Sequence, residues 1–95
     1  MPAIGVLTME LRIEQAHSLK EKRHVVKSLK ERLGNRHNIS IAEVDYQDLH
    51  QSALLAAVTV SSSRQFAEQV LQAVERDAYH EVGEMLIRAN VEWVE

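Results

Sequence analysis

The sequence contains no cysteine, so neither a disulfide nor a thiolate metal site can stabilise this chain. Absence of cysteine is typical of proteins in a reducing environment, and we expect a cytoplasmic location. No apolar run approaches the roughly 20 residues needed to cross a bilayer. Glu10 and Arg12 interrupt the first apolar stretch, and no basic region precedes it, so we expect neither a signal peptide nor a membrane partner.

Glycine, proline and aromatic residues are also scarce. With three glycines and one proline, the 95 residues are predicted to form a single domain, residues 1–95, with short connections. The aromatic residues are Tyr46, Phe66, Tyr79 and Trp93. An RNA-recognition sheet stacks bases on aromatic side chains of its central strands. None of the four lies in residues 3–13 or 53–60, the two segments that we expect to be the central strands, and this disfavours that mode of RNA binding.

The sequence does contain a clear succession of strand and helix patterns. Residues 3–13 and 85–94 alternate apolar and polar side chains, and residues 53–60 are apolar throughout, as strands are. Residues 38–46 alternate too, with a change of phase at Val44 that predicts a β-bulge or burial on both faces. A second helix is predicted to begin with a cap at Ser62 or Ser63 and to end near residues 80–83.

The first helix is predicted over residues 18–33, where apolar residues follow helical spacing. Ser18 and Glu21 have the spacing of a capping box, in which each side chain accepts a hydrogen bond from the other residue's backbone amide. Gly34 is predicted to end the helix in a left-handed conformation.

The resulting order, β-α-β-β-α-β, predicts an α+β, ferredoxin-like sandwich. Two right-handed crossovers would place the antiparallel strands in the order 4-1-3-2, with both helices on one face of the sheet. The opposite face would then be uncovered, and Ile4 and Val6 would put apolar surface on it. We therefore expect a homodimer.

Charge is distributed unevenly along this chain. Residues 17–37 contain seven basic and two acidic residues, a net charge of +5, whereas the rest contains four basic and twelve acidic residues, a net charge of −8. Such a division indicates that one face meets an anionic partner. Four basic residues at spacings of three, four and three form what we call the basic ridge: Lys20, Arg23, Lys27 and Lys30. They can contact phosphates or pair with acidic residues of the second helix: Glu68, Glu75 and Asp77. The sequence leaves both readings open.

Lys22 lies in the middle of the apolar stripe of the first helix. Its side chain must therefore extend past the sheet edge to water or meet a partner. With Lys20 and Arg23 it also places three cations in the first turns of a helix, where the macrodipole disfavours cations and attracts an anion. Local conflicts of this kind tend to mark functional sites. The predicted anion- or RNA-binding site consists of His17, Ser18, Lys20, Lys22, Arg23, Lys27 and Lys30.

No catalytic or metal-binding pattern stands out. The five histidines lack metal-ligand spacing, so we expect no metal and no cofactor. His17 is either a ligand contact or a solvated loop residue. Asp45, Asp48 and His50 could perform acid–base chemistry, but the same residues are typical of a polar turn. A glycine-rich phosphate loop and a nucleophile motif are both missing, so we expect that the protein is not an enzyme.

The chain resembles the bacterial YlxP-like group, the domain-of-unknown-function 503 family, in four stretches: G-V-L at residues 5–7, A-H-S-L-K-E-K-R at 16–23, V-V-K-S-L at 25–29 and N-I-S-I-A-E-V-D at 38–45. The resemblance covers nearly the whole chain. It implies a small ferredoxin-like cytoplasmic protein, encoded near translation and ribosome-maturation factors, and it supplies no catalytic residue. His50 stands where such proteins often have tryptophan.

Three functions compete at this point. The first is a noncatalytic module that binds RNA or a ribosomal subunit through the basic first helix. The second is a homodimeric interaction scaffold that uses the open face of the sheet or an edge strand. The third, an acylphosphatase-type enzyme, is disfavoured, because residues 14–17 contain no glycine to cradle phosphate and Glu14 would repel it.

Overall fold

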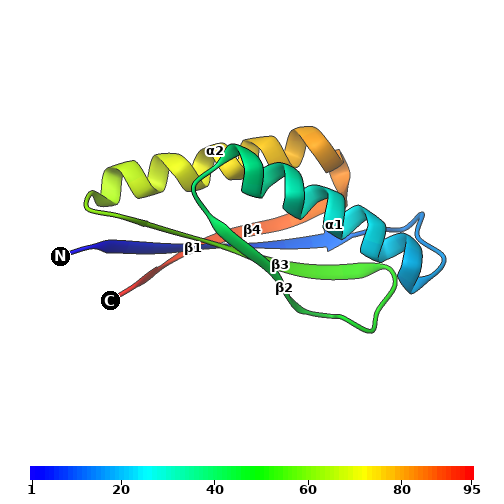
Figure 1. Ribbon diagram of the computed structural model, residues 1–95. Helices are drawn as coiled ribbons and strands as arrows, with labels where there is room; N and C mark the ends of the chain where they lie inside the picture. The colour runs from blue at the N-terminus through cyan, green and yellow to red at the C-terminus, as the bar shows by residue number, and fades with distance from the viewer.

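A computed structural model describes all residues, 1–95. Its elements follow the predicted order (Figure 1). They are β1 (Ala3–Arg12), α1 (Leu19–Arg36), β2 (Ser40–Asp45), β3 (Ser52–Ser61), α2 (Arg64–Val82), the short 3₁₀ turn η1 (Gly83–Met85) and β4 (Leu86–Val94). No helix is both long enough and apolar enough to cross a membrane.

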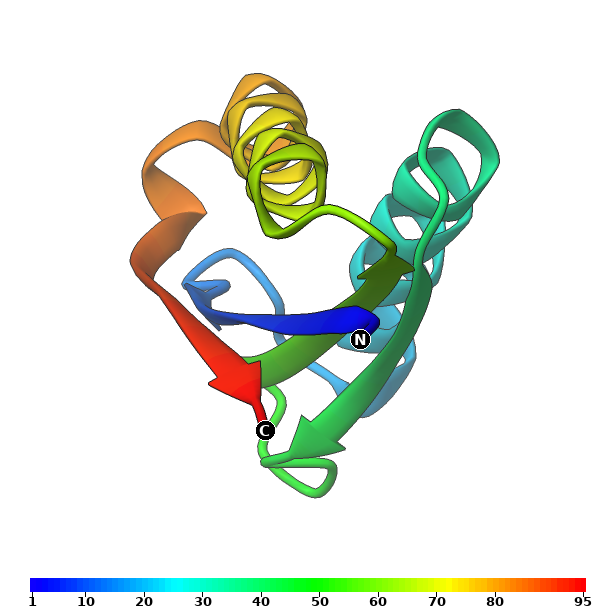
Figure 2. The ribbon, with the colours of Figure 1, turned by 90° about the vertical axis from the view of Figure 1, so that its left-hand side faces the viewer.

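The four strands form one antiparallel sheet in the order β2-β3-β1-β4, which is the predicted order read from the other edge. Both helices lie on the same face of the sheet, as predicted (Figure 2). β1 and β3 are central, with Leu7 opposite Ala57 and Met9 opposite Leu55. The ferredoxin-like α+β fold is therefore confirmed.

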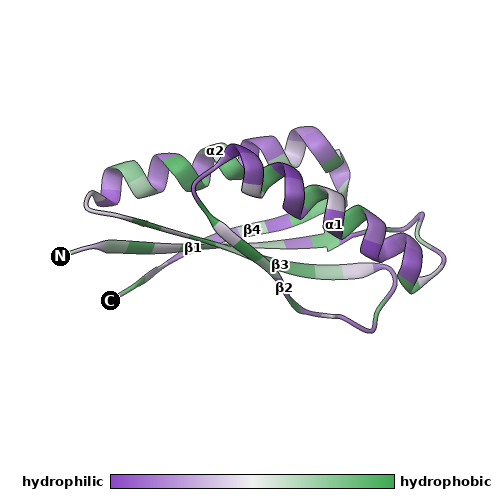
Figure 3. Cartoon of the chain, viewed as in Figure 1, coloured by the Kyte–Doolittle hydropathy of each residue, from purple (hydrophilic) through white to green (hydrophobic).

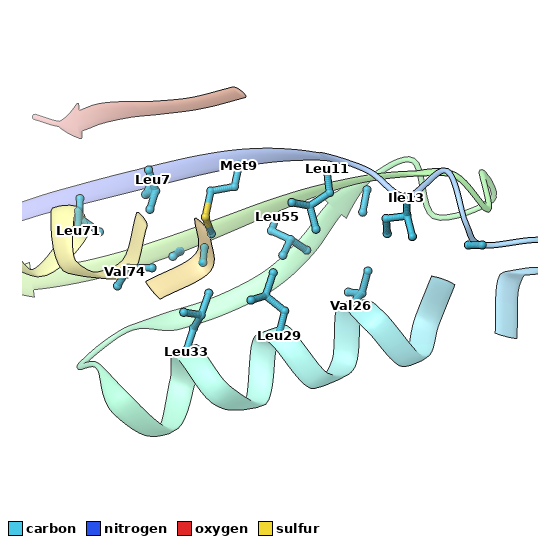
Figure 4. Close-up of a cluster of buried hydrophobic side chains, with 14 residues drawn as sticks. Leu7, Met9, Leu11, Ile13, Val26, Leu29, Leu33, Leu55, Leu71 and Val74 are labelled. Carbon is cyan, nitrogen blue, oxygen red and sulfur yellow. The ribbon is translucent and has the colours of Figure 1, made fainter. Parts of the chain in front are cut away.

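The core fills the space between the sheet and the two helices (Figure 4). Because strand side chains alternate between faces, every second residue of β1 points to the helices, and Leu7, Met9 and Leu11 are fully buried. Leu29 and Leu33 of α1 approach them from the helix layer. The other face of the sheet carries no helix.

Helix α1 is longer than predicted, and Gly34 does not end it. The helix continues to Arg36, and the backbone amide of the cap residue His37 donates to the Leu33 carbonyl. Gly34 remains helical inside the last turn, whereas Gly83, with φ of 56° and ψ of −126°, ends α2 in a positive-φ conformation that favours glycine. The predicted stop at Gly34 was therefore wrong, whereas the second helix ends within the predicted range, residues 80–83.

Two register shifts modify the edge strands. One lies between Glu43 and Asp45 of β2, and with Val44 50% exposed it favours the first of the two predicted alternatives, a bulge, over burial on both faces. The other lies where Glu10 and Leu11 of β1 meet β4, and it leaves Ile87 46% exposed. Met85 belongs to η1 rather than to β4, so the predicted alternation of the last strand holds only from Ala89 onward.

Candidate anion-binding surface on the first helix

The N-terminus of α1 is closed by a variant of the predicted capping box, in which the Glu21 carboxylate binds the His17 amide instead of the Ser18 amide. The Ser18 hydroxyl accepts a hydrogen bond from the Glu21 amide at 3.1 Å, and the Glu21 carboxylate accepts one from the His17 amide at 2.8 Å. An internal carboxylate thus occupies the position where a helix N-terminus attracts an anion. Ser18 is used for capping, and His17 has an exposed side chain beside the cap.

The loop before α1 uses its polar backbone groups internally. The Ala16 amide donates to the Ile13 carbonyl at 3.1 Å. The Gln51 side chain donates to the carbonyls of Glu14 and Ala16 at 3.0 and 3.3 Å. The amides of Ala16 and His17 thus already have internal acceptors, which makes them poor phosphate ligands and does not favour acylphosphatase chemistry.

The basic ridge is free of internal partners. Lys20, Arg23 and Lys27 are exposed and Lys30 is half-buried, and none of the four has a carboxylate oxygen within 4.0 Å. Hydrophilic residues dominate this stretch of α1 (Figure 3). Of the two readings that the sequence left open, pairing of the ridge with Glu68, Glu75 or Asp77 of α2 does not occur.

The orientation of α1 about its own axis explains why the basic ridge has no carboxylate partner. Arg32 and Arg36 reach Glu81 of α2 at 3.2 and 3.4 Å, so their side of α1 faces α2. At 3.6 residues per turn, the ridge lies about half a turn around the helix from this pair. It therefore faces away from α2 and from the acidic residues that could neutralise it.

Lys22 is separated from the ridge by its burial. Its side chain is fully buried, and its ammonium contacts Glu43 Oε2 and donates to the Tyr46 carbonyl, both at 2.6 Å. The facing oxygen of Glu43 is buried and has no hydrogen-bond partner, so its contact with the Lys22 ammonium is an ion pair. Lys22 therefore pairs with a carboxylate inside the fold. Its ammonium does not reach water and is not accessible to an external anion. The expectation that it serves a ligand does not fit this position.

A shallow hollow of about 430 Å³ adjoins the ridge at Lys20. Ile13, Ala16 and Val25 form its apolar lining, and Lys20 and His24 contribute basic side chains. Glu21, which also lines it, is already engaged in the capping box. The N-terminal end of the ridge thus combines positive charge with a concave apolar surface.

The structure contains no group of three or more histidine, cysteine, aspartate or glutamate side chains placed so that they could hold a metal ion. Asp45 accepts a hydrogen bond from the Tyr46 amide at 2.8 Å, and Tyr46 has φ of 66°, so the acidic loop is a tight turn. Asp48 and His50 are exposed in it.

Sequence reasoning missed the contact between His37 and Asp77. The His37 Nε2 donates to Asp77 Oδ2 at 2.6 Å and joins the end of α1 to α2. This hydrogen bond lowers the pKa of the Asp77 carboxyl below its ordinary value of 3.8. The two residues are 40 positions apart, and no local pattern connects them.

The model of the family described as "Protein of unknown function (DUF503)" matches residues 4–91. The uncharacterized protein YlxP of Bacillus subtilis is 40% identical over 92 residues, which are 95% of this chain and 98% of that protein.

Among solved structures, the likeness is one of fold alone. The designed protein Foldit4 has a TM-score of 0.61 at 7% identity, covering 100% of this chain and 98% of that one. Rv0793 of Mycobacterium tuberculosis has a TM-score of 0.56 at 14% identity, covering 100% and 94%. A dimeric ferredoxin-like protein from Thermobifida fusca has a TM-score of 0.50 at 12% identity, covering 96% and 90%.

Proposed function

The chain belongs to the DUF503 family, and from the geometry of α1 we propose that it is a noncatalytic cytoplasmic module that binds structured RNA, free or on a ribosomal surface. The contacts come from the basic ridge: Lys20, Arg23, Lys27 and Lys30. RNA is the favoured partner because its phosphates form a regular row of negative charges, and the ridge is a row of positive ones.

The observation that carries this proposal is that the ridge has no internal partners. Basic residues without a carboxylate nearby attract external anions locally, even on a protein whose net charge is −3. With a rise of 1.5 Å per residue, the ridge spans about 15 Å, a length that covers several phosphates of one strand. The helix keeps these side chains in one row.

The test is salt-dependent RNA binding with a matched pair of variants. If the ridge contacts four phosphates, log affinity is expected to fall with log salt at a slope of roughly −3, using the single-strand coefficient. Arg23→Gln with Lys27→Gln removes two contacts and is expected to flatten the slope by about 1.4. Filter binding or fluorescence anisotropy between low and physiological salt measures both quantities.

Arg32→Gln with Arg36→Gln is the control, because it removes the same charge from the same helix. These two arginines pair with Glu81 and face α2, so the slope is expected to stay near the wild-type value. An equal effect of the two double variants would indicate attraction by net charge alone and would contradict the proposal. So would a lack of binding to RNA or ribosomes by micromolar protein at low salt.

A second candidate function, protein association through the open face of the sheet, rests on exposed apolar side chains. Val58, Val60 and Val94 are 36%, 56% and 54% exposed, and Ile4 and Val6 beside them are half-buried. Neighbouring exposed apolar residues favour an interface. The partner we propose for this face is a second copy of the chain.

Sedimentation across a concentration range tests this second candidate. The wild type is expected to shift from monomer to dimer with increasing concentration, and Val60→Lys is expected to shift the equilibrium toward monomer, because it places a charge in the apolar contact. A wild-type protein that stays monomeric at high micromolar concentration would contradict it.

A further inference from the structure

The sheet has two free edges, and they differ in how well they are protected. β2 has six residues, and its register shift between Glu43 and Asp45 interrupts regular pairing. Beyond its own register shift, β4 pairs regularly with β1 from Arg88 to Val94. The outer edge of β4 pairs with no other strand, and β4 contains neither lysine nor proline. Such an edge can accept another strand.

The side chains of β4 are complementary to a second copy of themselves. In an antiparallel pair of identical strands, residues at equal distances from the two-fold axis lie opposite one another. An axis at Asn90 places Arg88 opposite Glu92 of the partner subunit, and the same contact occurs twice. Shifting the axis to Ala89 or Val91 removes both ion pairs, so charge selects one register.

These charges are available for such a contact. Arg88, Asn90 and Glu92 are all exposed, and their side chains share the open face of the sheet, because they lie opposite Glu10, Thr8 and Val6 of β1. Arg88 contacts Glu10 at 3.4 Å, but its side chain is 76% exposed. An exposed pair of this kind is weak, so Arg88 can also reach a partner strand.

The helix side of β4 offers apolar surface beside the same edge. A groove of about 530 Å³ lies between α2 and β4, with Leu86 and Ala89 among its lining residues. Tyr79 and Ile87 border it and are 56% and 46% exposed. With the axis at Asn90, Val91 of the partner subunit would lie opposite Ala89 and beside this groove.

We propose that β4 pairs antiparallel with β4 of a second copy, with the two-fold axis at Asn90, so that two four-stranded sheets become one continuous sheet. The occupant is a second copy because the charge pattern of the strand is complementary to itself. This interface does not use the basic ridge, and of the exposed valines it includes only Val94, at the end of the paired strands. It therefore does not depend on RNA binding or on contact between the open faces of two sheets.

Disulfide cross-linking tests this interface directly, because the chain has no cysteine of its own. In the proposed dimer the two copies of residue 90 are one strand spacing apart, about 4.8 Å. Asn90→Cys is therefore expected to form a disulfide-linked dimer under mild oxidation. Denaturing electrophoresis without reductant measures the rate.

Thr8→Cys is the matched control, because Thr8 lies opposite Asn90 on the same face, one strand further from the edge. Its two copies would be about 14 Å apart in the proposed dimer, too far for a disulfide. We expect Asn90→Cys to cross-link at least roughly tenfold faster, since only that pair satisfies the distance limit of about 7 Å. Equal rates, as in a face-to-face dimer, or no cross-linking of Asn90→Cys, would overturn the proposal.

Charge exchange tests the register. In the Asn90→Cys background, Arg88→Glu or Glu92→Arg alone places like charges opposite one another twice, and is expected to slow cross-linking by roughly tenfold. The combined exchange restores opposite charges and is expected to restore the rate. Both positions are exposed, and circular dichroism confirms that the variants fold. Failure of the combined exchange to restore the rate would overturn the register, and unaffected single variants would overturn the self-pairing itself.

Discussion

Replacing Glu43 with methionine is expected to destabilise the fold by about 3–5 kcal/mol, the usual cost of leaving a buried charge without its partner. Lys22 is fully buried and has only the Glu43 carboxylate and the Tyr46 carbonyl as polar contacts. Glu43→Met leaves the ammonium with the carbonyl alone. For a chain of this size the thermal midpoint would fall by more than about 10 °C, which thermal or urea unfolding measures.

The reverse variant is expected to be milder. Lys22→Met removes the ammonium, but the Glu43 side chain is 16% exposed and can take up water in its place. Combining Lys22→Met with Glu43→Met removes both charges, and an apolar pair of this kind is often as stable as the ion pair that it replaces. We expect the double variant to recover most of the stability lost in Glu43→Met, and to bind RNA like the wild type, because the ammonium of Lys22 lies inside the fold.

Glu81→Met is the control for this cycle. Glu81 also pairs with cations, but Arg32 and Arg36 are 54% and 50% exposed, so losing these contacts is expected to cost no more than about 1 kcal/mol. A Glu43→Met protein as stable as Glu81→Met would show that the Lys22–Glu43 contact contributes little.

Leu71→Ala is expected to destabilise the core by about 2–5 kcal/mol, because Leu71 is fully buried and truncation leaves a cavity. The site is unusual because Gly5 faces it. A methyl group on Gly5 would lie 2.8 Å from Leu71 Cδ1 and 2.9 Å from the Trp93 ring, closer than carbon atoms pack. Gly5→Ala alone is therefore expected to cost about 1–3 kcal/mol through overpacking.

The two changes are expected to compensate when combined. In the double variant the new methyl group occupies space that Leu71 has left, so the loss should be smaller than the sum of the two single losses by at least about 0.5 kcal/mol. Urea unfolding of the wild type and the three variants completes the cycle. Additive losses would show that the two side chains do not compete for one space.

The sequence by itself determined the elements and their order. Alternation along residues 3–13, the Ser18 cap and a serine cap at residue 62 or 63 are local patterns, and the structure contains the alternation, the Ser18 cap and a cap at Ser63. They are readable because they connect residues only a few positions apart. The strand order followed from the element order, since right-handed crossovers allow few alternatives.

The charge division was also readable in the sequence, but the roles of the individual cations were not. Lys22 and Lys20 are two residues apart, yet one is fully buried and the other exposed. Helical spacing predicted that Lys22 faces the sheet. Its partner Glu43 lies on β2, and the register of β2 against β3 determines which β2 side chain lies beside Lys22.

Tertiary structure alone decided which cations remain free. Arg32 and Arg36 form ion pairs with Glu81, whereas the basic ridge forms none, because α1 packs with one side toward α2 and the other away from it. Tertiary structure also decided the contact between His37 and Asp77, which depends on how close the end of α1 lies to α2. Periodicity sets which face of a helix is apolar, but the packing of that face against the rest of the chain sets which charges meet, and those distances are absent from any local pattern.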